Sequence, residues 1–97
     1  MNNKLIKILK TFTKKEIKEF EKFLKSPYYT EGKNLRRNIL IKYFTSIKKY
    51  HPEFNNKNFN KEYLYYKLYG SSVYNDLIMR NLNSVTFRLA KEYLILK

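Results

Sequence analysis

The sequence predicts one all-α domain, a compact bundle of about five helices. Apolar side chains recur every three or four residues along most of the chain, which is the spacing of a buried helix face. Two stretches carry helix-start signals, at Thr13 and at Asn60. Hydrophobic residues make up 43% of the 97 residues, which is too apolar for a disordered chain and enough for a single core. The single domain 1–97 is expected to hold helices at residues 3–12, 13–25, 34–50, 60–69 and 75–96.

The last stretch, residues 74–96, has the longest uninterrupted helical periodicity, and the rest of the chain is expected to pack against it. Its apolar side chains fall on one stripe, formed by Ile78, Leu82, Val85, Leu89 and Tyr93 and flanked by Met79 and Leu96. The opposite side mixes polar residues with Leu77, Phe87 and Ile95. This mixture predicts either neighbours on more than one side or an exposed binding surface.

The first helix is short and amphipathic, with an apolar stripe formed by Leu5, Ile8, Leu9 and Phe12. Thr13 is expected to be the N-cap of the second helix, because Glu16 follows three residues later and completes a capping box. Phe12 and Ile17 have the spacing of the hydrophobic staple that accompanies such a box. This boundary between two helices is therefore well specified.

The second helix is expected to bury Ile17, Phe20, Phe23 and Leu24. Its lysines alternate with Glu16, Glu19 and Glu21, and the simplest interpretation is a solvated face on which lysines and glutamates pair with one another. Pro27 ends this helix, because the residue before a proline avoids the helical conformation.

Residues 28–32 are expected to form a loop, in which Tyr28 and Tyr29 either cover the core or provide a stacking platform for a base or a partner. The third helix should bury Ile39, Leu40, Tyr43, Phe44, Ile47 and Tyr50. Arg36 and Arg37 open it, and cations there oppose the helix dipole, so an anionic partner is expected near them. Glu31 is a local candidate for that partner.

After the third helix, His51 is expected to act as a C-cap cation and Phe54 as the anchor of a polar loop. Asn60 predicts the N-cap of the fourth helix, with Phe59 and Leu64 as its staple, and Gly70 follows its end. The inner face of this helix would be Leu64, Tyr65 and Leu68, with Tyr63, Tyr66 or Tyr69 partly outside. Asn75 or Ser72 is expected to cap the last helix.

The formal net charge is +13, and most of it lies in the first half of the chain. Residues 1–50 hold 14 Lys and Arg against 4 Asp and Glu, whereas residues 51–97 hold 7 against 4. A positive potential attracts polyanions such as nucleic acid and acidic membrane surfaces. Because 17 of the 21 basic residues are lysines and the chain is rich in Asn, Tyr and Ile, A/T-rich codon usage is an alternative explanation of the charge.

The sequence predicts no catalytic, cofactor-binding or metal-binding residues. One histidine, no cysteine and two distant glycines provide neither a nucleophile–base pair, nor thiolate ligands, nor a glycine-rich phosphate loop. No apolar run reaches the roughly 20 residues that span a bilayer, and the lysine-rich start lacks the apolar region of a signal peptide. We therefore expect a soluble, cytoplasmic, non-enzymatic protein without a small-molecule substrate.

The pattern Leu5-x3-Leu9-x2-Phe12-Thr13-Lys14-Lys15-Glu16, continued as far as Leu24, resembles the first two helices of the pyrin-type branch of the death-fold superfamily. That family has a leucine-spaced helix, then a Ser/Thr-x-x-Glu start and an amphipathic helix rich in Lys and Phe. The resemblance implies homotypic protein–protein assembly through charged and apolar helix faces.

A second resemblance, over residues 65–89, is to the winged-helix modules of bacterial regulators. It lies in the short helix that ends at Tyr69-Gly70, the turn after it, and Arg80-Asn81-Leu82-Asn83. The second helix of those modules enters the major groove, and no strand pair for a wing follows in this chain. The resemblance implies that Arg80, Asn83, Ser84, Phe87, Arg88 and Lys91 face DNA.

The chain also resembles bacterial helical proteins, and that resemblance implies no activity. It lies in Phe-x-Lys-Lys-Glu from Phe12, Ser-Pro-Tyr from Ser26 and Tyr-Asn-Asp from Tyr74.

The sequence thus predicts an interaction or assembly module whose basic surface docks a protein partner or another copy of the chain. The expected partner-binding residues are Lys14, Lys15, Lys18, Lys22, Lys25, Arg36 and Arg37. The alternative is nucleic-acid binding by the basic first half or by the terminal helix. Nucleic-acid readers favour the bidentate fork of arginine, and only 4 of the 21 basic residues are arginines, which favours protein partners.

Overall fold

The computed structural model describes residues 3–26, 34–71 and 73–97, and for residues 34–37 it describes the backbone alone. Over these residues the chain forms five α-helices and no strand, which confirms the predicted fold class. The helices are α1 (Lys4–Leu9), α2 (Lys14–Lys25), α3 (Asn34–Lys48), α4 (Lys61–Tyr69) and α5 (Asp76–Leu96).

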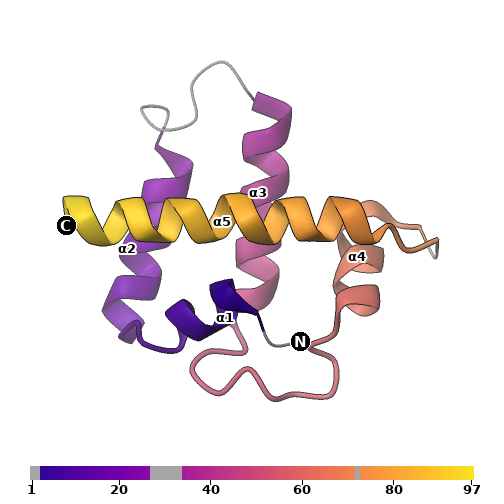
Figure 1. The fold of residues 1–97 in the computed structure, drawn as a ribbon, viewed down its shortest axis with the longest axis horizontal. Coiled ribbons are helices and arrows are strands. Elements are labelled where there is room, and N and C mark those ends of the chain that lie inside the picture. The colour runs from indigo at the N-terminus through magenta and orange to yellow at the C-terminus, as the bar shows by residue number, and fades with distance from the viewer. Residues whose placement is uncertain (1–2, 27–33, 72) are drawn as a thin grey trace.

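Helix α5 is the element against which the others are arranged. In Figure 1 it lies across α2 and α3, which run side by side behind it, while α1 lies beneath it and α4 near its N-terminal end. Helices α1, α2 and α3 each contact α5, and further contacts join α2 to α3 and α3 to α4. The expectation that the rest of the chain packs against the terminal helix is confirmed for α1, α2 and α3, whereas α4 packs mainly against α3.

The buried face of α5 is rotated from the predicted stripe. Its buried residues are Met79, Leu82, Thr86, Leu89, Ala90 and Tyr93. Ile78 and Val85 are only partly buried, and Leu96 is 60% exposed. Thr86 tolerates burial because its hydroxyl donates to the Leu82 carbonyl oxygen at 2.7 Å, within its own helix. A threonine and an alanine therefore occupy core positions that a pattern of large apolar residues does not reveal.

The centre of the core is an aromatic cluster around the fully buried ring of Phe20. The ring centroid of Phe44 on α3 is 5.0 Å away and that of Tyr93 on α5 is 5.7 Å away, while Phe12, between α1 and α2, is at 5.9 Å. The Phe12 and Phe44 contacts are edge-to-face, the geometry that aromatic pairs prefer. One side chain of α2 thus touches residues from three other parts of the chain.

The predicted helix starts are confirmed at atomic detail. The Thr13 amide donates to Glu16 Oε1 at 2.8 Å and the Glu16 amide donates to Thr13 Oγ1 at 3.1 Å, which is the complete capping box. Asn60 and Asn75 accept from the amides of Tyr63 and Ile78 at 2.8 and 3.2 Å. Gly70 ends α4 with a φ of +66°, a conformation that favours glycine.

Two helices end earlier than the sequence predicts. Helix α1 stops at Leu9 and α3 at Lys48, and tighter turns follow, in which the Phe12 amide donates to the Leu9 carbonyl oxygen and the Tyr50 amide to that of Ile47. The first turn directs Phe12 into the core, where it is buried. Local periodicity does not show this change of direction.

The role predicted for His51 is wrong, and that predicted for Phe54 is confirmed. His51 Nε2–H donates to the carbonyl oxygen of Phe12 at 2.7 Å and so ties the loop to the α1–α2 turn, because the ring reaches across to another segment instead of its own helix end. Phe54 is buried, with its ring centroid 5.4 Å from that of Phe59. Residues 28–32, with the prediction for Tyr28 and Tyr29, lie outside the described residues.

The buried residues of the shorter helices agree with the predicted inner faces except at a few positions. On α4, Leu64, Tyr65 and Leu68 are buried as predicted, and Tyr66 and Tyr69 are exposed. Four side chains assigned to the inner faces are only partly buried, and these are Ile8, Phe23, Ile39 and Tyr50. Ile6, which the sequence pattern left out, is buried.

Replacing Leu82 with Ala should lower the free energy of unfolding by about 2 to 5 kcal/mol, because it removes a side chain that is only 6% exposed and leaves a cavity. The measurement is chemical denaturation followed by the helical circular dichroism signal. Leu77→Ala is the matched control on the same helix, since Leu77 is 60% exposed and its loss should change stability little. Equal effects of the two substitutions would contradict the packing of α5.

Candidate functional site

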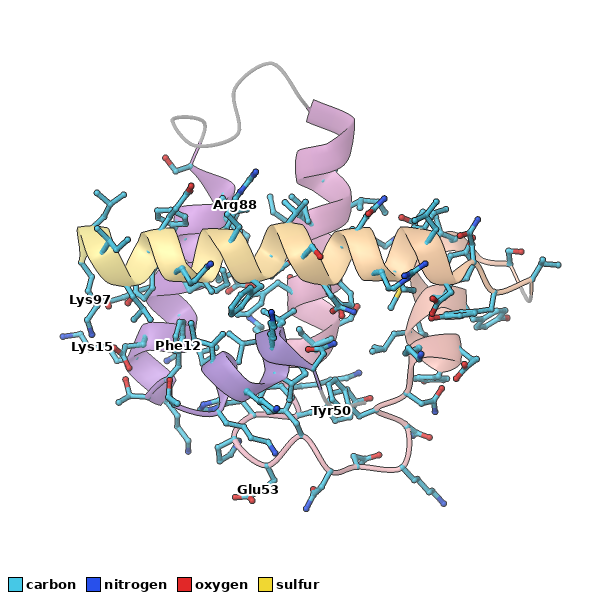
Figure 2. All side chains as sticks on the ribbon, viewed as in Figure 1. Phe12, Lys15, Tyr50, Glu53, Arg88 and Lys97 are labelled. Carbon is cyan, nitrogen blue, oxygen red and sulfur yellow. The ribbon has the colours of Figure 1, made fainter. Side chains whose placement is uncertain are left out.

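Five lysines of α2 form an exposed surface on one side of this helix. Lys14, Lys15, Lys18, Lys22 and Lys25 are all exposed, and Figure 2 shows Lys15 at the edge of the molecule. With 3.6 residues per turn, these five positions fall within an arc of about 100°. We call this surface the lysine face.

The three glutamates of α2 have their main contacts outside the lysine face, and Glu21 also lies 4.0 Å from Lys25 at its edge. Glu19 Oε1 accepts a hydrogen bond from the Tyr93 hydroxyl at 2.6 Å. Glu21 accepts from Lys48 Nζ with both oxygens, at 2.9 and 2.8 Å, and Glu16 forms an ion pair with Lys97. The carboxylates therefore bind residues of α3 and of the C-terminal end of the chain.

The predicted pairing of lysines with glutamates within α2 is confirmed for one pair, Lys25 with Glu21, and is not found for the other four lysines among the described residues. Among the described residues, Lys14, Lys15, Lys18 and Lys22 form no ion pair, and Lys25 lies 4.0 Å from Glu21. The physical reason is the position of the glutamates on the flanks of the helix. There Glu19 and Glu21 meet donors on neighbouring helices, in partly buried contacts where a charged hydrogen bond is worth more than between exposed side chains. Glu16 meets Lys97 in an exposed contact.

These contacts alter the acidity of the carboxyl groups. Hydrogen bonds from Lys97 and Thr13 hold the pKa of Glu16 below its ordinary value of 4.5. Hydrogen bonds from Lys48 likewise lower the pKa of Glu21. Both glutamates are thus held in the charged form mainly by partners outside the lysine face, with a smaller contribution from Lys25 to Glu21.

The side chains of Arg36 and Arg37, the other two expected partner-binding residues, lie outside the described residues.

The six residues predicted for nucleic-acid binding divide into two groups in the structure. Arg80, Asn83, Ser84 and Phe87 line a cleft of about 360 Å³ together with Asn3, Lys4, Leu5 and Lys61. Arg88 and Lys91 are exposed on α5 and do not line this cleft. Lys91 Nζ instead lies 4.6 Å from the centroid of the Phe87 ring, within range of a cation–π contact. The structure therefore gathers four of the six residues at one place.

Asp76 joins two cations of the cleft. Its carboxylate lies 2.9 Å from Arg80 Nε and 3.5 Å from Lys61 Nζ, and it accepts a hydrogen bond from the Tyr74 hydroxyl at 2.9 Å. These contacts lower the pKa of Asp76, with the hydrogen bond from Tyr74 as the main cause. Partial burial, together with the bond to Asp76, raises the pKa of Tyr74 to about 12. The network links α4 to the first turn of α5 through charged groups.

Sequence reasoning missed Asn3, Lys4 and Lys61 as neighbours of the α5 residues. They come from the starts of α1 and α4 and meet α5 only after folding, so no local pattern marks them. A helical wheel of α2, in contrast, places Glu21 and Glu19 beside the two edges of the lysine arc and Glu16 about 100° beyond it. This arrangement can be read from the sequence. Its meaning becomes clear only when the elements that flank α2 are known.

Acidification should destabilise the protein through Glu16, Glu21 and Asp76. Their pKa values are lower in the folded state, so the unfolded chain binds protons at higher pH than the folded chain does. Their contribution to stability is complete above their ordinary pKa values and is lost as the pH falls through the lower folded values. Thermal unfolding at a series of pH values from neutral to about pH 3 measures this loss.

Glu21→Gln should reduce that loss of stability on acidification, because it removes one of the three groups. Glu53→Gln is the matched control, since Glu53 is exposed and forms no ion pair within the described chain. An identical acid dependence in the wild type and both variants would show that the Lys48–Glu21 contact does not form in solution.

Over the described residues, no group of three His, Cys, Asp or Glu side chains is placed to hold a metal ion. None of the helices there combines the length and apolar character needed to cross a membrane. Comparison with models of protein families, with curated protein sequences and with solved structures finds no match to this chain.

Proposed function

We propose that the protein is a non-enzymatic interaction module that docks the acidic surface of a protein partner on the lysine face of α2. One observation carries this proposal. The glutamates that could neutralise the face bind mainly Lys48, Tyr93 and Lys97, so Lys14, Lys15, Lys18 and Lys22 form no ion pair among the described residues and present their charge to solvent. A partner that supplies carboxylates would complete the ion pairs that the helix itself does not make.

The chemistry of lysine fits recognition by overall charge. Its ammonium group is a compact charge on a flexible stem, without the planar fork by which arginine binds carboxylate or phosphate bidentately. A surface of this kind accelerates association and selects partners by the sign of their charge. Exposed ion pairs are weakened by salt, because the Debye length is about 8 Å at physiological ionic strength. We therefore expect a transient, salt-sensitive complex.

The lysine face favours a different protein over a second copy of the chain. In a two-fold symmetric dimer, the same surface meets itself, so five lysines would face five lysines. Such an arrangement brings like charges together and costs free energy. Self-association would require the lysine face of one copy to meet another surface, and the net charge of +13 opposes that approach as well.

Nucleic acid is the competing partner, since phosphates attract lysines by the same physics. The lysine face holds no arginine, the residue most used for specific contacts with guanine. Binding of nucleic acid by this face would therefore be independent of sequence.

The test compares two variants with the same change of charge. One replaces Lys14, Lys15, Lys18 and Lys22 with Glu, and the control replaces Lys57, Lys67, Arg88 and Lys91 with Glu. All eight residues are exposed, so both variants should keep a melting temperature near that of the wild type. Binding to poly-L-glutamate, as an acidic polypeptide, and to mixed-sequence duplex DNA is followed by fluorescence anisotropy at increasing salt.

We expect the α2 variant to lose at least about tenfold in affinity for poly-L-glutamate, and the control to lose much less, with wild-type binding declining between about 50 and 200 mM salt. Equal losses in the two variants would show that only net charge matters. Tight DNA binding that prefers one sequence would assign the protein to the nucleic-acid alternative.

A further inference from the structure

We propose that the cleft between α1, α4 and α5 binds a nucleoside phosphate, with its phosphate on Lys4, Lys61 and Arg80 and its base against Phe87. This proposal goes beyond the proposed function and concerns a different surface, since no residue of the cleft belongs to the lysine face. The ligand is either a free nucleotide or one unit of a single-stranded nucleic acid, and both sources share the same chemistry.

The polar groups of the cleft are hydrogen-bond donors. Asn3 Oδ1 already accepts from the Ile6 amide at 2.9 Å, and Asn83 Oδ1 accepts from the Tyr43 hydroxyl. Neither NH2 group has a hydrogen-bond partner within the described chain. The ammonium groups of Lys4 and Lys61 and the guanidinium group of Arg80 are further donors. Together, these donors favour a ligand rich in acceptor oxygens.

The acceptor role of the Asn3 oxygen is fixed by its partner. Asn3 caps α1, and a backbone N–H can only donate, so the oxygen must face it. At Asn83, Oδ1 faces the hydroxyl of the buried Tyr43, whose pKa is raised by burial, so that the hydroxyl keeps a proton to donate to Oδ1. The two NH2 groups remain available to a ligand.

Three cations converge on the cleft from different elements. Lys4 begins α1, Lys61 begins α4, and Arg80 lies in the second turn of α5. Asp76 contacts Lys61 and Arg80 and so restrains both, while Lys4 is exposed and forms no ion pair among the described residues. One carboxylate against three cations leaves a net positive charge, which suits a phosphate.

Phe87 supplies the apolar part of the site. Its side chain is partly buried and lines the cleft, while Lys91 lies over its ring. An aromatic side chain beside cations is the combination by which proteins bind single nucleotides, since bases stack on the ring and phosphates pair with the cations. The volume of about 360 Å³ is at the lower end for small-molecule sites and suits one nucleotide unit.

The experiment is a calorimetric titration of the intact protein with adenosine monophosphate, adenosine, inorganic phosphate and a short oligothymidylate. It is repeated with Arg80→Gln, Phe87→Leu and the control Arg88→Gln, which removes the same charge from an exposed position on the same helix outside the cleft. A double variant, Lys18→Gln with Lys22→Gln, reports any contribution of the lysine face. Thermal melts establish that each variant is folded.

We expect adenosine monophosphate or the oligothymidylate to bind at least about tenfold more tightly than phosphate or adenosine alone, because base and phosphate contribute together. Arg80→Gln and Phe87→Leu should each weaken that binding about tenfold, and the other two variants by less than about twofold. Binding of the oligothymidylate alone would identify a strand as the source of the ligand.

Three results would overturn the proposal. They are no binding of either nucleotide probe, equal binding of phosphate and adenosine monophosphate, and a loss in Arg88→Gln or in the lysine-face double variant as large as that in Arg80→Gln. Each of these results can occur whether or not the lysine face binds poly-L-glutamate. Failure of the nucleotide proposal can therefore be distinguished from failure of the proposed function.

Discussion

Burial of the Phe20 ring is the constraint on which the rest of the structure depends. The ring has no exposed surface and is surrounded by aromatic rings from α3, α5 and the α1–α2 turn, so it fixes where each of these segments crosses α2. Aromatic side chains bury more area than other residues, and edge-to-face contacts add direction to that attraction. Once Phe20 is placed, the flanks of α2 face α3 on one side and the end of α5 on the other, and only one arc remains open to solvent.

That geometry separates the charges of α2. Lysines and glutamates alternate in the sequence, but the glutamates lie where neighbouring helices offer donors and the lysines lie on the open arc. The neighbours thus remove negative charge from the surface without burying an unpaired carboxylate, which would be costly. A helix with a nearly balanced composition presents an almost uniformly positive surface, and the packing of the core produces this outcome.

The fold was largely predictable because its signals are local. Caps at Thr13 and Asn60 and periodicity along α5 depend on residues within a few positions of one another. The early end of α1, the reach of His51 to Phe12 and the burial of Thr86 depend on contacts between distant segments. The candidate sites divide in the same way. The lysines of α2 could be selected from the sequence. The absence of ion pairs at four of them within the described chain, and the meeting of Lys4 and Lys61 with Arg80, arise only when the helices pack.

The contacts of Glu16 affect the order in which parts of the fold open. Its Oε1 closes the capping box of α2 and its Oε2 pairs with Lys97, while one turn later Glu19 binds Tyr93. The first turn of α2 is therefore attached to the final turn of α5, although these turns are far apart in sequence. Helix ends normally fray independently, with little free energy opposing their opening. Here side-chain contacts join the two ends, so we expect amide hydrogen exchange in the opening turn of α2 to follow the fraying of the end of α5.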